Sequence, residues 1–421
     1  MRWMCWRGRF LAVGCAAVRA TRALPAAFLA VVLAVACEKA KQSPLAVVAR
    51  APQASEQTVA AVAALPTLGF SSGIVSHADA SLLRAALDAA QRVGVSLFVG
   101  DPRLLTADTP LDSAFAHADQ LLGHFAAHPA CAGYWLGTTA DTLLFDRVAA
   151  IGQRMAVGDR LHPVLVGLSG YGADAARGPS RFSFRSLERF IATVRPSLLY
   201  FDQQGVVDGA TAPDFFANLS TIRRVALASR LPWWGVVLEP RPGDETLRDN
   251  YVRLQAMSLL AHGAKGLQYV LDWSVLQGWS APRAPLSSVA RGVAEINATV
   301  AAWSPILSHA TCTAVYHSAP VPTGGDPLSL EGIVYRVDGE YTTVALFRGK
   351  RKKDLYVMVV NRNYSRGAKP RLYFGGQVKG LEEVAPPEAA RLIRHFAPRE
   401  SPRAVSVLLK AGGGRLFRLL T

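Results

Sequence analysis

From residue 45 to about residue 308, the chain repeats one pattern eight times: a short apolar run, a few polar residues, then an amphipathic stretch of helical period. Alternation of this kind predicts βα units and a parallel sheet. Eight such units over roughly 260 residues match the size of a (β/α)8 TIM barrel. The predicted strands cover residues 45–50, 72–76, 95–100, 132–137, 163–167, 198–202, 233–239 and 266–273.

The helical stretches between these strands have clear periods and stop signals. In 80–93 the apolar residues recur at i, i+3 and i+4, and Gly94 follows as a stop. A second helix is expected over 214–229, and a third ends at Gly263. A doubly wound open sheet is the alternative architecture. It usually carries a glycine-rich phosphate loop, and the sequence has neither GxGxxG nor GxxxxGK[ST].

After Pro305 the pattern changes to short alternating segments separated by Gly, Pro and Asn. This pattern predicts a small antiparallel β-sandwich behind the barrel. Gly339-Glu340 is expected to form a hairpin turn, and residues 320–327 a loop. The predicted strands are 311–318, 332–338, 341–348, 355–361, 371–374, 405–409 and 415–419.

The first 36 residues have the layout of a secretory signal peptide. They hold five arginines and no acid, and they end in a 14-residue apolar run that leads directly to Cys37. Residues 33–37 resemble a bacterial lipobox, which predicts cleavage after residue 36, lipidation of Cys37 and a tether over 37–44. The alternative is an ordinary signal peptide with Cys37 incidental; a transmembrane anchor is the weaker reading, because a spanning helix needs about 20 residues. The protein is therefore expected to be exported and held by lipid at the bacterial cell envelope, on its periplasmic or surface side.

Charge and cysteine content narrow the expected partners only slightly. The net charge is +15, from 46 basic and 31 acidic residues, which would suit a membrane surface or an acidic glycan, or simply solvated faces. The five cysteines include no CxxC pair, so neither a disulfide framework nor a zinc site is expected. His124 and His128 stand four residues apart, but without HExxH or a nearby carboxylate a rim or capping role is favoured over a metal pair. No cofactor site and no nucleic-acid motif is found, and the oligomeric state is left open.

In a barrel of this kind the chemistry lies where strands end and βα loops begin. Glu239 is the most informative residue there, because a carboxylate at the end of an apolar strand must be solvated or paired in a cleft. A rim salt bridge to Arg241 or Arg248 is its alternative role. Tryptophans near strands could stack on sugar rings or fill the core. The candidates for binding are Trp135, Thr138, Thr139, Gln203, Trp234, Asp272 and Trp273.

Three segments and the tail carry a resemblance to a known family. They are Gly133-Tyr-Trp-Leu-Gly-Thr-Thr-Ala140, Pro196-Ser-Leu-Leu-Tyr-Phe-Asp202, the run from Gln255 to Tyr269, and Ala411-Gly-Gly-Gly-Arg-Leu-Phe-Arg-Leu419. Together they resemble the clan-A-type glycoside hydrolase barrels of the β-galactosidase and endoglucanase-like groups. In that family a strand-four carboxylic acid protonates the leaving oxygen, and a strand-seven carboxylate is the nucleophile. The resemblance places Glu239 at the nucleophile position, but Thr138-Thr139 stand where Asp-Glu would supply the acid.

Two functions follow from this mixture of kept and lost residues. A threonine hydroxyl is far too weak an acid to replace the carboxyl group, which favours a catalytically degenerate barrel that binds glycan or a surface partner. The alternative is an active retaining glycoside hydrolase with Glu239 as nucleophile and Asp141 or Asp202 as acid/base. Fold alone does not decide between them.

Overall fold

The structure is a computed structural model that describes residues 45–50, 55–106, 108–139, 141–169, 184–203, 206–207, 210–238, 245–270 and 288–421. The described residues belong to one compact unit, Pro44–Thr421. Five residues singled out from the sequence lie outside the described ranges: Cys37, Glu239, Arg241, Asp272 and Trp273.

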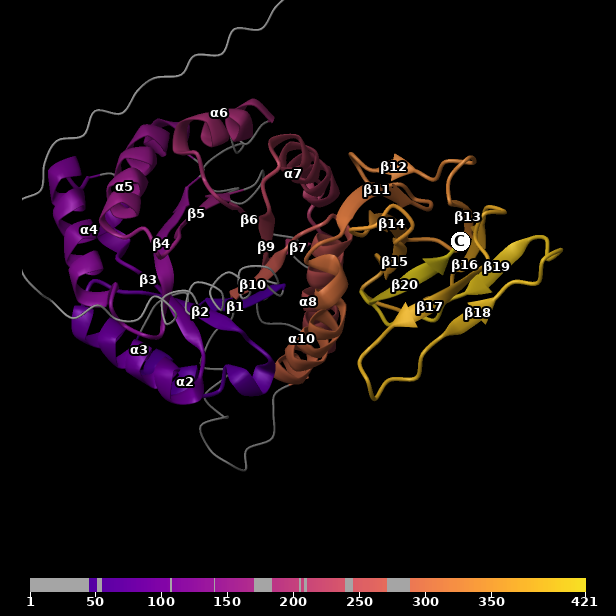
Figure 1. Ribbon diagram of the computed structural model, residues 1–421, viewed down its shortest axis with the longest axis horizontal. Helices are drawn as coiled ribbons and strands as arrows, with labels where there is room; N and C mark the ends of the chain where they lie inside the picture. The colour runs from indigo at the N-terminus through magenta and orange to yellow at the C-terminus, as the bar shows by residue number, and fades with distance from the viewer. Residues whose placement is uncertain are drawn as a thin grey trace, which may run out of the picture. The chain divides into compact units, whose positions relative to one another are not determined.

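Eight parallel strands form a closed barrel in the order β1-β10-β9-β6-β5-β4-β3-β2 (Figure 1). All eight predicted strands are confirmed over the described residues; residue 239 of the seventh and residues 271–273 of the eighth lie outside the described ranges. The barrel closes where β1 pairs with β10, from Ala46 opposite Gly266 to Arg50 opposite Val270. The strands are β1 Ala46–Arg50, β2 Ser72–Ser76, β3 Ser96–Gly100, β4 Cys131–Thr139, β5 Val164–Ser169, β6 Leu199–Asp202, β9 Trp233–Leu238 and β10 Gly266–Val270.

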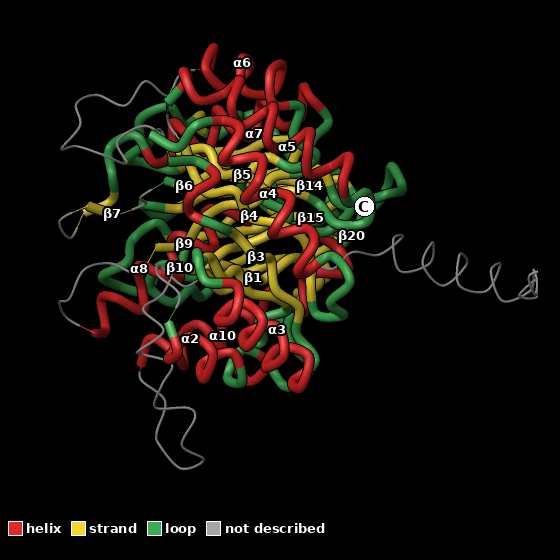
Figure 2. Tube along the Cα trace, turned by 90° about the vertical axis from the view of Figure 1, so that its left-hand side faces the viewer, coloured by secondary structure: helices red, strands yellow, loops and turns green. Residues whose placement is uncertain are grey.

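Helices surround the barrel strands, as the tube view in Figure 2 shows. In α3 (Ala80–Val93), Leu83, Leu87 and Ala90 are buried, the Asp79 side chain caps the first turn, and Gly94 ends the helix in the left-handed conformation. This helix has the predicted bounds. The other helices are α2 Glu56–Val62, α4 Leu111–Phe125, α5 Phe145–Gly158, α6 Phe184–Val194, α7 Phe215–Ser229, α8 Glu245–Ala261 and α10 Ser288–Leu307, with 3-10 turns η1 Pro66–Leu68, η2 Pro102–Leu104 and η3 Thr142–Leu144.

Successive strand residues alternate between two apolar clusters. One lies under the helices, and the other fills the barrel interior with Val48, Ile74, Phe98, Trp135, Leu165, Tyr200 and Val236. A short ladder of β7 (Val206–Val207) and β8 (Ala210–Thr211) stands apart from the barrel sheet.

The second part of the chain folds into two antiparallel layers around their own core. A seven-stranded sheet has the order β12-β11-β14-β15-β20-β17-β18, and a three-stranded sheet has the order β13-β16-β19. Val359 and Phe417 from the first sheet pack with Leu372 and Phe374 from the second. The predicted fold, a barrel followed by a small sandwich, is confirmed. The strands are β11 Thr311–His317, β12 Asp326–Pro327, β13 Val334–Asp338, β14 Thr342–Arg348, β15 Leu355–Asn361, β16 Arg371–Phe374, β17 Gly380–Val384, β18 Ile393–His395, β19 Arg403–Ser406 and β20 Gly414–Leu420.

The centre of the seven-stranded sheet is buried on both faces. Alternate residues of β15 point to different cores: Val357 and Val359 belong to the sandwich core, whereas Met358 and Val360 belong to the large core shared with the barrel helices. The sandwich therefore completes the apolar packing around α8.

Several predicted details of the sandwich are wrong. Gly339-Glu340 does not form a hairpin turn, because β13 pairs with β16 and β14 pairs with β11 and β15, so the turn joins two different sheets. The predicted loop 320–327 ends in the short strand β12, which pairs with β11. The strand expected over 405–409 is β19, which begins and ends earlier. The strands β17 and β18 were not predicted, because polar residues on their exposed sides interrupt the apolar alternation.

Candidate functional site

At the carboxyl ends of the barrel strands, one arginine connects opposite sides of the barrel. Arg50 ends β1, and its Nη1 donates to Thr138 Oγ1 at 3.4 Å while its Nη2 lies 3.3 Å from Asp202 Oδ2. Thr138 is on β4 and Asp202 ends β6, the two strands that flank β5 on the far side of the barrel from β1. We call Arg50, Thr138 and Asp202 the mouth cluster.

A bulge in β4 directs Thr138 into the barrel. The register with β5 shifts between Trp135 and Gly137, so Trp135 lies opposite Leu165 and Thr138 lies opposite Gly167. Trp135 and Leu165 both belong to the interior cluster. Gly137 takes a φ of 123°, which residues with a side chain rarely adopt. The glycine therefore allows the strand to gain a residue and present the Thr138 hydroxyl to Arg50.

Aromatic rings support the mouth cluster from inside the barrel. The Arg50 guanidinium lies 5.6 Å from the centre of the Trp135 ring, and Trp135 packs against Tyr200 with ring centres 4.9 Å apart. The Tyr200 hydroxyl is buried near Gln268, whose amide is fully buried and has no hydrogen bond of standard geometry among the described residues. The barrel interior thus carries polar groups directly below the mouth.

The electrostatic environment of Asp202 combines two opposing effects. Burial raises the pKa of the Asp202 carboxyl above its usual value, and the ion pair and hydrogen bond with Arg50 reduce that rise without cancelling it. Burial also raises the pKa of Tyr200, with a smaller opposing effect from Arg50. Asp202 is therefore easier to protonate than an exposed aspartate.

Asp141, the other candidate acid, has a local structural role. Its Oδ1 accepts from the Leu143 backbone N–H at 2.8 Å and caps η3, and its own N–H donates to Thr139 Oγ1 at 3.1 Å. Thr139 is buried and lies opposite Leu168, on the helix-facing side of the sheet. Thr139 and Asp141 thus stabilise the turn after β4, and neither residue contacts the mouth cluster among the contacts of the described residues.

The candidate binding residues occupy different levels of the barrel. Trp234 is the second residue of β9, at the amino end, where its ring packs against Phe98 with centres 6.3 Å apart. Trp135 is buried inside the barrel. Gln203 follows Asp202 and is buried, and its amide has no hydrogen bond among the described residues. Of these candidates Thr138 touches the mouth cluster directly, Trp135 lies under it, and Gln203 adjoins it along the chain.

A glutamine from α8 holds the carboxyl end of β9, the seventh barrel strand along the chain. The Gln255 amide donates to Leu238 O at 2.8 Å and accepts from Leu238 N–H at 3.2 Å. This bidentate contact holds the backbone of the last residue before Glu239. Gln255 is the first residue of one of the segments that carry the family resemblance. In the structure, this residue positions the end of β9.

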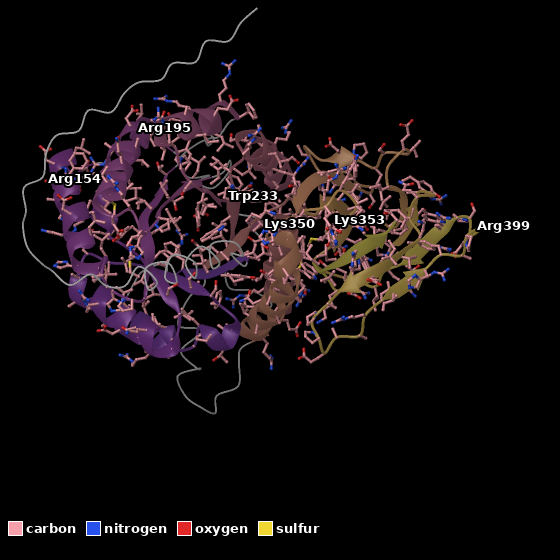
Figure 3. All side chains as sticks on the ribbon, viewed as in Figure 1. Arg154, Arg195, Trp233, Lys350, Lys353 and Arg399 are labelled. Atoms are coloured by element: carbon pink, nitrogen blue, oxygen red, sulfur yellow. The ribbon has the colours of Figure 1, made fainter. Side chains whose placement is uncertain are left out.

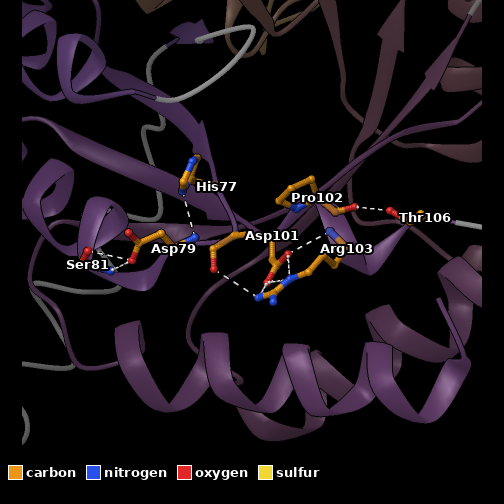
Figure 4. A network of polar contacts seen from close by, with 8 residues as sticks. His77, Asp79, Ser81, Asp101, Pro102, Arg103 and Thr106 are labelled. Atoms are coloured by element: carbon orange, nitrogen blue, oxygen red, sulfur yellow. Dashed lines mark hydrogen bonds and ion pairs between the residues drawn. The ribbon is translucent and has the colours of Figure 1, made fainter.

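The polar residues that follow β2 and β3 contact one another and their own loops (Figure 4). Asp101 pairs with Arg103, with Nη2 to Oδ2 at 2.6 Å, and the His77 ring accepts the Asp79 N–H at 2.9 Å. These contacts shape the loops after the strands and include no residue of the mouth cluster.

Sequence reasoning missed Arg50, Tyr200 and Gln268. A polar Gln268 in the middle of an apolar strand was the available signal, because a buried amide needs a partner. The role of Arg50 could not be predicted from the sequence, because charged residues are common at strand ends.

The two histidines considered as a metal pair do not share a helix, because α4 ends at Phe125. His128 lies beyond it, its Nε2 is 3.0 Å from Asp88 Oδ1, and its Nδ1 accepts the Ala130 N–H. His128 therefore links α3 to the turn before β4. Within the ranges that the structure describes, no group of three His, Cys, Asp or Glu residues is placed to hold a metal ion. None of the described helices has the length and apolar character needed to cross a membrane.

No family model and no curated protein matches the sequence. Solved structures match the fold: Eubacterium rectale Amy13B aligns with a TM-score of 0.53 and 7% identity over 91% of this chain and 98% of that one. A GH30 endoxylanase from Clostridium papyrosolvens C71 aligns with a TM-score of 0.46 and 10% identity, over 90% and 97%. An endo-β-1,4-mannanase from Thermotoga petrophila aligns at 0.43 and 11%, over 88% and 92%. The likeness to Amy13B is one of fold, a closed parallel barrel followed by an accessory β-sandwich.

Proposed function

We propose that the protein is an exported lipoprotein whose glycoside hydrolase-like barrel binds carbohydrate at its mouth without hydrolysing ordinary glycosides. The observation that supports this proposal is the contact of Arg50 with both Thr138 and Asp202. A permanently charged guanidinium contacts Thr138, one of the two threonines that stand where the family resemblance expects the acidic residues. The Thr138 hydroxyl cannot supply a proton to a leaving alkoxide at neutral pH.

The same groups suit sugar recognition. A guanidinium offers several fixed donors, a carboxylate accepts hydrogen bonds, and a hydroxyl does both, which together match the mixed donors and acceptors of a sugar ring. Arg50 and Asp202 are each partly exposed at 18% and 16% of their side-chain surface, so both can be reached from solvent. The aromatic floor of Trp135 and Tyr200 limits their movement and preorganises the site.

A second candidate is an active hydrolase with Asp202 as acid/base and Glu239 as nucleophile. It is favoured by the raised pKa of Asp202, which a general acid requires, and by the pairing of β6 with β9, the strand that precedes Glu239. Neighbouring strands lie about 5 Å apart, which is near the separation of carboxyl groups in retaining enzymes.

Hydrolysis of aryl glycosides separates the two candidates, because a good leaving group needs little acid help. If the binding proposal holds, the wild-type protein binds glycans on an array, Arg50→Gln loses that binding, and neither protein releases the aryl group. If the hydrolase is correct, the wild-type protein releases the aryl group and Glu239→Gln loses that release, whereas Asp202→Asn keeps most of it but hydrolyses natural glycosides about 10²- to 10⁴-fold more slowly. Asp141→Asn is the matched control, since its carboxylate caps η3 and should affect neither readout.

The lipid anchor is a separate part of the proposal. It rests on the arginine-rich stretch and apolar run that lead to Cys37. Metabolic labelling with palmitate should label the wild-type protein and not Cys37→Ser, and the variant should leave the membrane fraction. Retained label in the variant would contradict lipidation at this residue.

A further inference from the structure

At the amino end of the barrel, opposite the mouth cluster, a cavity of about 400 Å³ lies between α7, the starts of β9 and β10, and the connection from α10 to β11. Its basic side chains include Arg223 and Arg230 on and after α7, Lys265 before β10, and His309 before β11. No carboxylate is among the described residues that line it. We call this space, with these four residues in its lining, the basic cavity.

The cations of the basic cavity have donor capacity that nearby groups do not use. Arg223 Nη1 donates to Cys312 O at 3.3 Å, but its Nε is buried with no partner among the described residues. Lys265 Nζ donates to Leu307 O at 2.6 Å and to Ala310 O, which leaves one of its three protons. His262 also lines the cavity, is fully buried, and has no partner for its Nε2 in the described part of the chain.

Positive groups act on one another across this cavity. Burial lowers the pKa of His309, and Lys350 and Lys265 lower it further. Burial also lowers the pKa of Lys265, to about 8. Lys350 belongs to the exposed hairpin tip 349–354 between β14 and β15 and is marked with Trp233, another lining residue, in Figure 3. An anion in the cavity would relieve this repulsion and satisfy the free arginine donor.

We propose that the basic cavity binds a phosphate-class oxyanion, with Arg223, Arg230 and Lys265 as its ligands and Lys350 at its rim. Three permanent or nearly permanent cations match a dianion better than a single carboxylate, and arginine forks fit the oxygens of a phosphate. Leu227, Leu231 and Trp233 supply an apolar wall, so the phosphate can carry an organic substituent. The ligand is either a free phosphate compound or the headgroup of an anionic lipid. This site is independent of the carbohydrate proposal, since it lies at the other end of the barrel.

Two binding measurements at fixed ionic strength test the proposal and separate the sources. Inorganic phosphate is titrated into the full chain by calorimetry, and the protein is sedimented with phosphatidylcholine vesicles with and without phosphatidylglycerol. Losing one charge-assisted hydrogen bond should weaken binding about tenfold in Arg230→Gln, a substitution at an exposed position at the end of α7. Arg223→Gln should lose at least as much, and Lys350→Gln should lose less.

Arg224→Gln is the matched control, because Arg224 is exposed on the same helix and does not line the cavity. Saturable phosphate binding that Arg230→Gln weakens and Arg224→Gln keeps would support a free-phosphate site. Binding only to phosphatidylglycerol vesicles, with the same pattern in the variants, would support the headgroup. Absence of both kinds of binding, or equal loss in the Arg224 and Arg230 variants, would overturn the proposal.

Discussion

Two buried histidines should make the fold sensitive to mild acid. His262 follows α8 and His317 ends β11, and their rings stack with centres 6.1 Å apart. His262 Nδ1 lies 2.7 Å from Ser258 O, and His317 Nδ1 lies 3.0 Å from Thr343 Oγ1. The pair therefore sits between a barrel helix and the first sandwich strand.

Both imidazoles are held neutral by their surroundings. Burial lowers the pKa of His262 to about 4, with help from Arg223. Burial lowers the pKa of His317 to about 2, with help from His262 and Arg362. In the unfolded chain both groups titrate near 6.5, so below that pH the unfolded state binds more protons than the folded state. The stabilising contribution is present above pH 6.5 and is lost as the pH falls.

The magnitude follows from the shifts. For His262 the difference of 6.5 − 4 = 2.5 pKa units corresponds to about 3 kcal/mol, lost by about pH 4. With both histidines, each pH unit below 6.5 removes about 2.7 kcal/mol, so a fall to about pH 5 removes about 4 kcal/mol. That is a large share of the 5–15 kcal/mol, roughly, that stabilises a typical domain.

Urea unfolding at several pH values between about 7 and 5 measures this effect. In His262→Gln the pH slope of the unfolding free energy should fall to about half, about 1.4 kcal/mol per unit. His395→Gln is the control, because His395 is exposed on β18. A wild-type stability that is flat between pH 6.5 and 5, or an equal change of slope in the control, would refute the reasoning.

Three further changes test other parts of the fold. Burial raises the pKa of Asp159, but hydrogen bonds, led by the one from Tyr134, outweigh it and lower the pKa to about 2. The contribution of this carboxylate to the unfolding free energy is therefore present above about pH 4 and lost towards pH 2. Asp159→Asn should remove that loss in acid unfolding curves. Gly137→Val should lower the unfolding free energy by at least about 1–3 kcal/mol, because it forces a branched residue to a φ of 123°, and an unchanged urea midpoint would contradict the role of the bulge. Gln268→Leu combined with Tyr200→Phe removes two poorly satisfied buried polar groups, so thermal unfolding should occur at the same or a higher temperature; a marked decrease would mean that these groups are satisfied in the folded protein.

The sequence predicted the barrel because each strand and helix leaves a local pattern. In α3 the apolar spacing and the Gly94 stop predict the bounds that the structure has, and the structure adds Asp79 as the cap of the first turn. Pairing between distant strands leaves a weaker pattern. Nothing local indicates that β13 pairs with β16 rather than with the next strand, so the hairpin predicted at Gly339-Glu340 was wrong.

The mouth cluster could be predicted only in part. Thr138 and Asp202 were identified because they stand at strand ends, but the contact between them depends on Arg50, which is 88 and 152 residues away along the chain. The β4 bulge decides which threonine faces inward, and a one-residue shift reverses every side chain. Glu239, Asp272 and Trp273 keep the roles predicted from sequence as hypotheses.

The closing pair of strands has a consequence for how the chain folds. Ala46 of β1 lies opposite Gly266 of β10, so the barrel cannot close until 266 − 46 = 220 further residues have been made. Such a long sequence separation slows folding and leaves both strand edges open in partly folded chains, where they can pair with other molecules. Aggregation during refolding should therefore depend on protein concentration most strongly before this last seam forms.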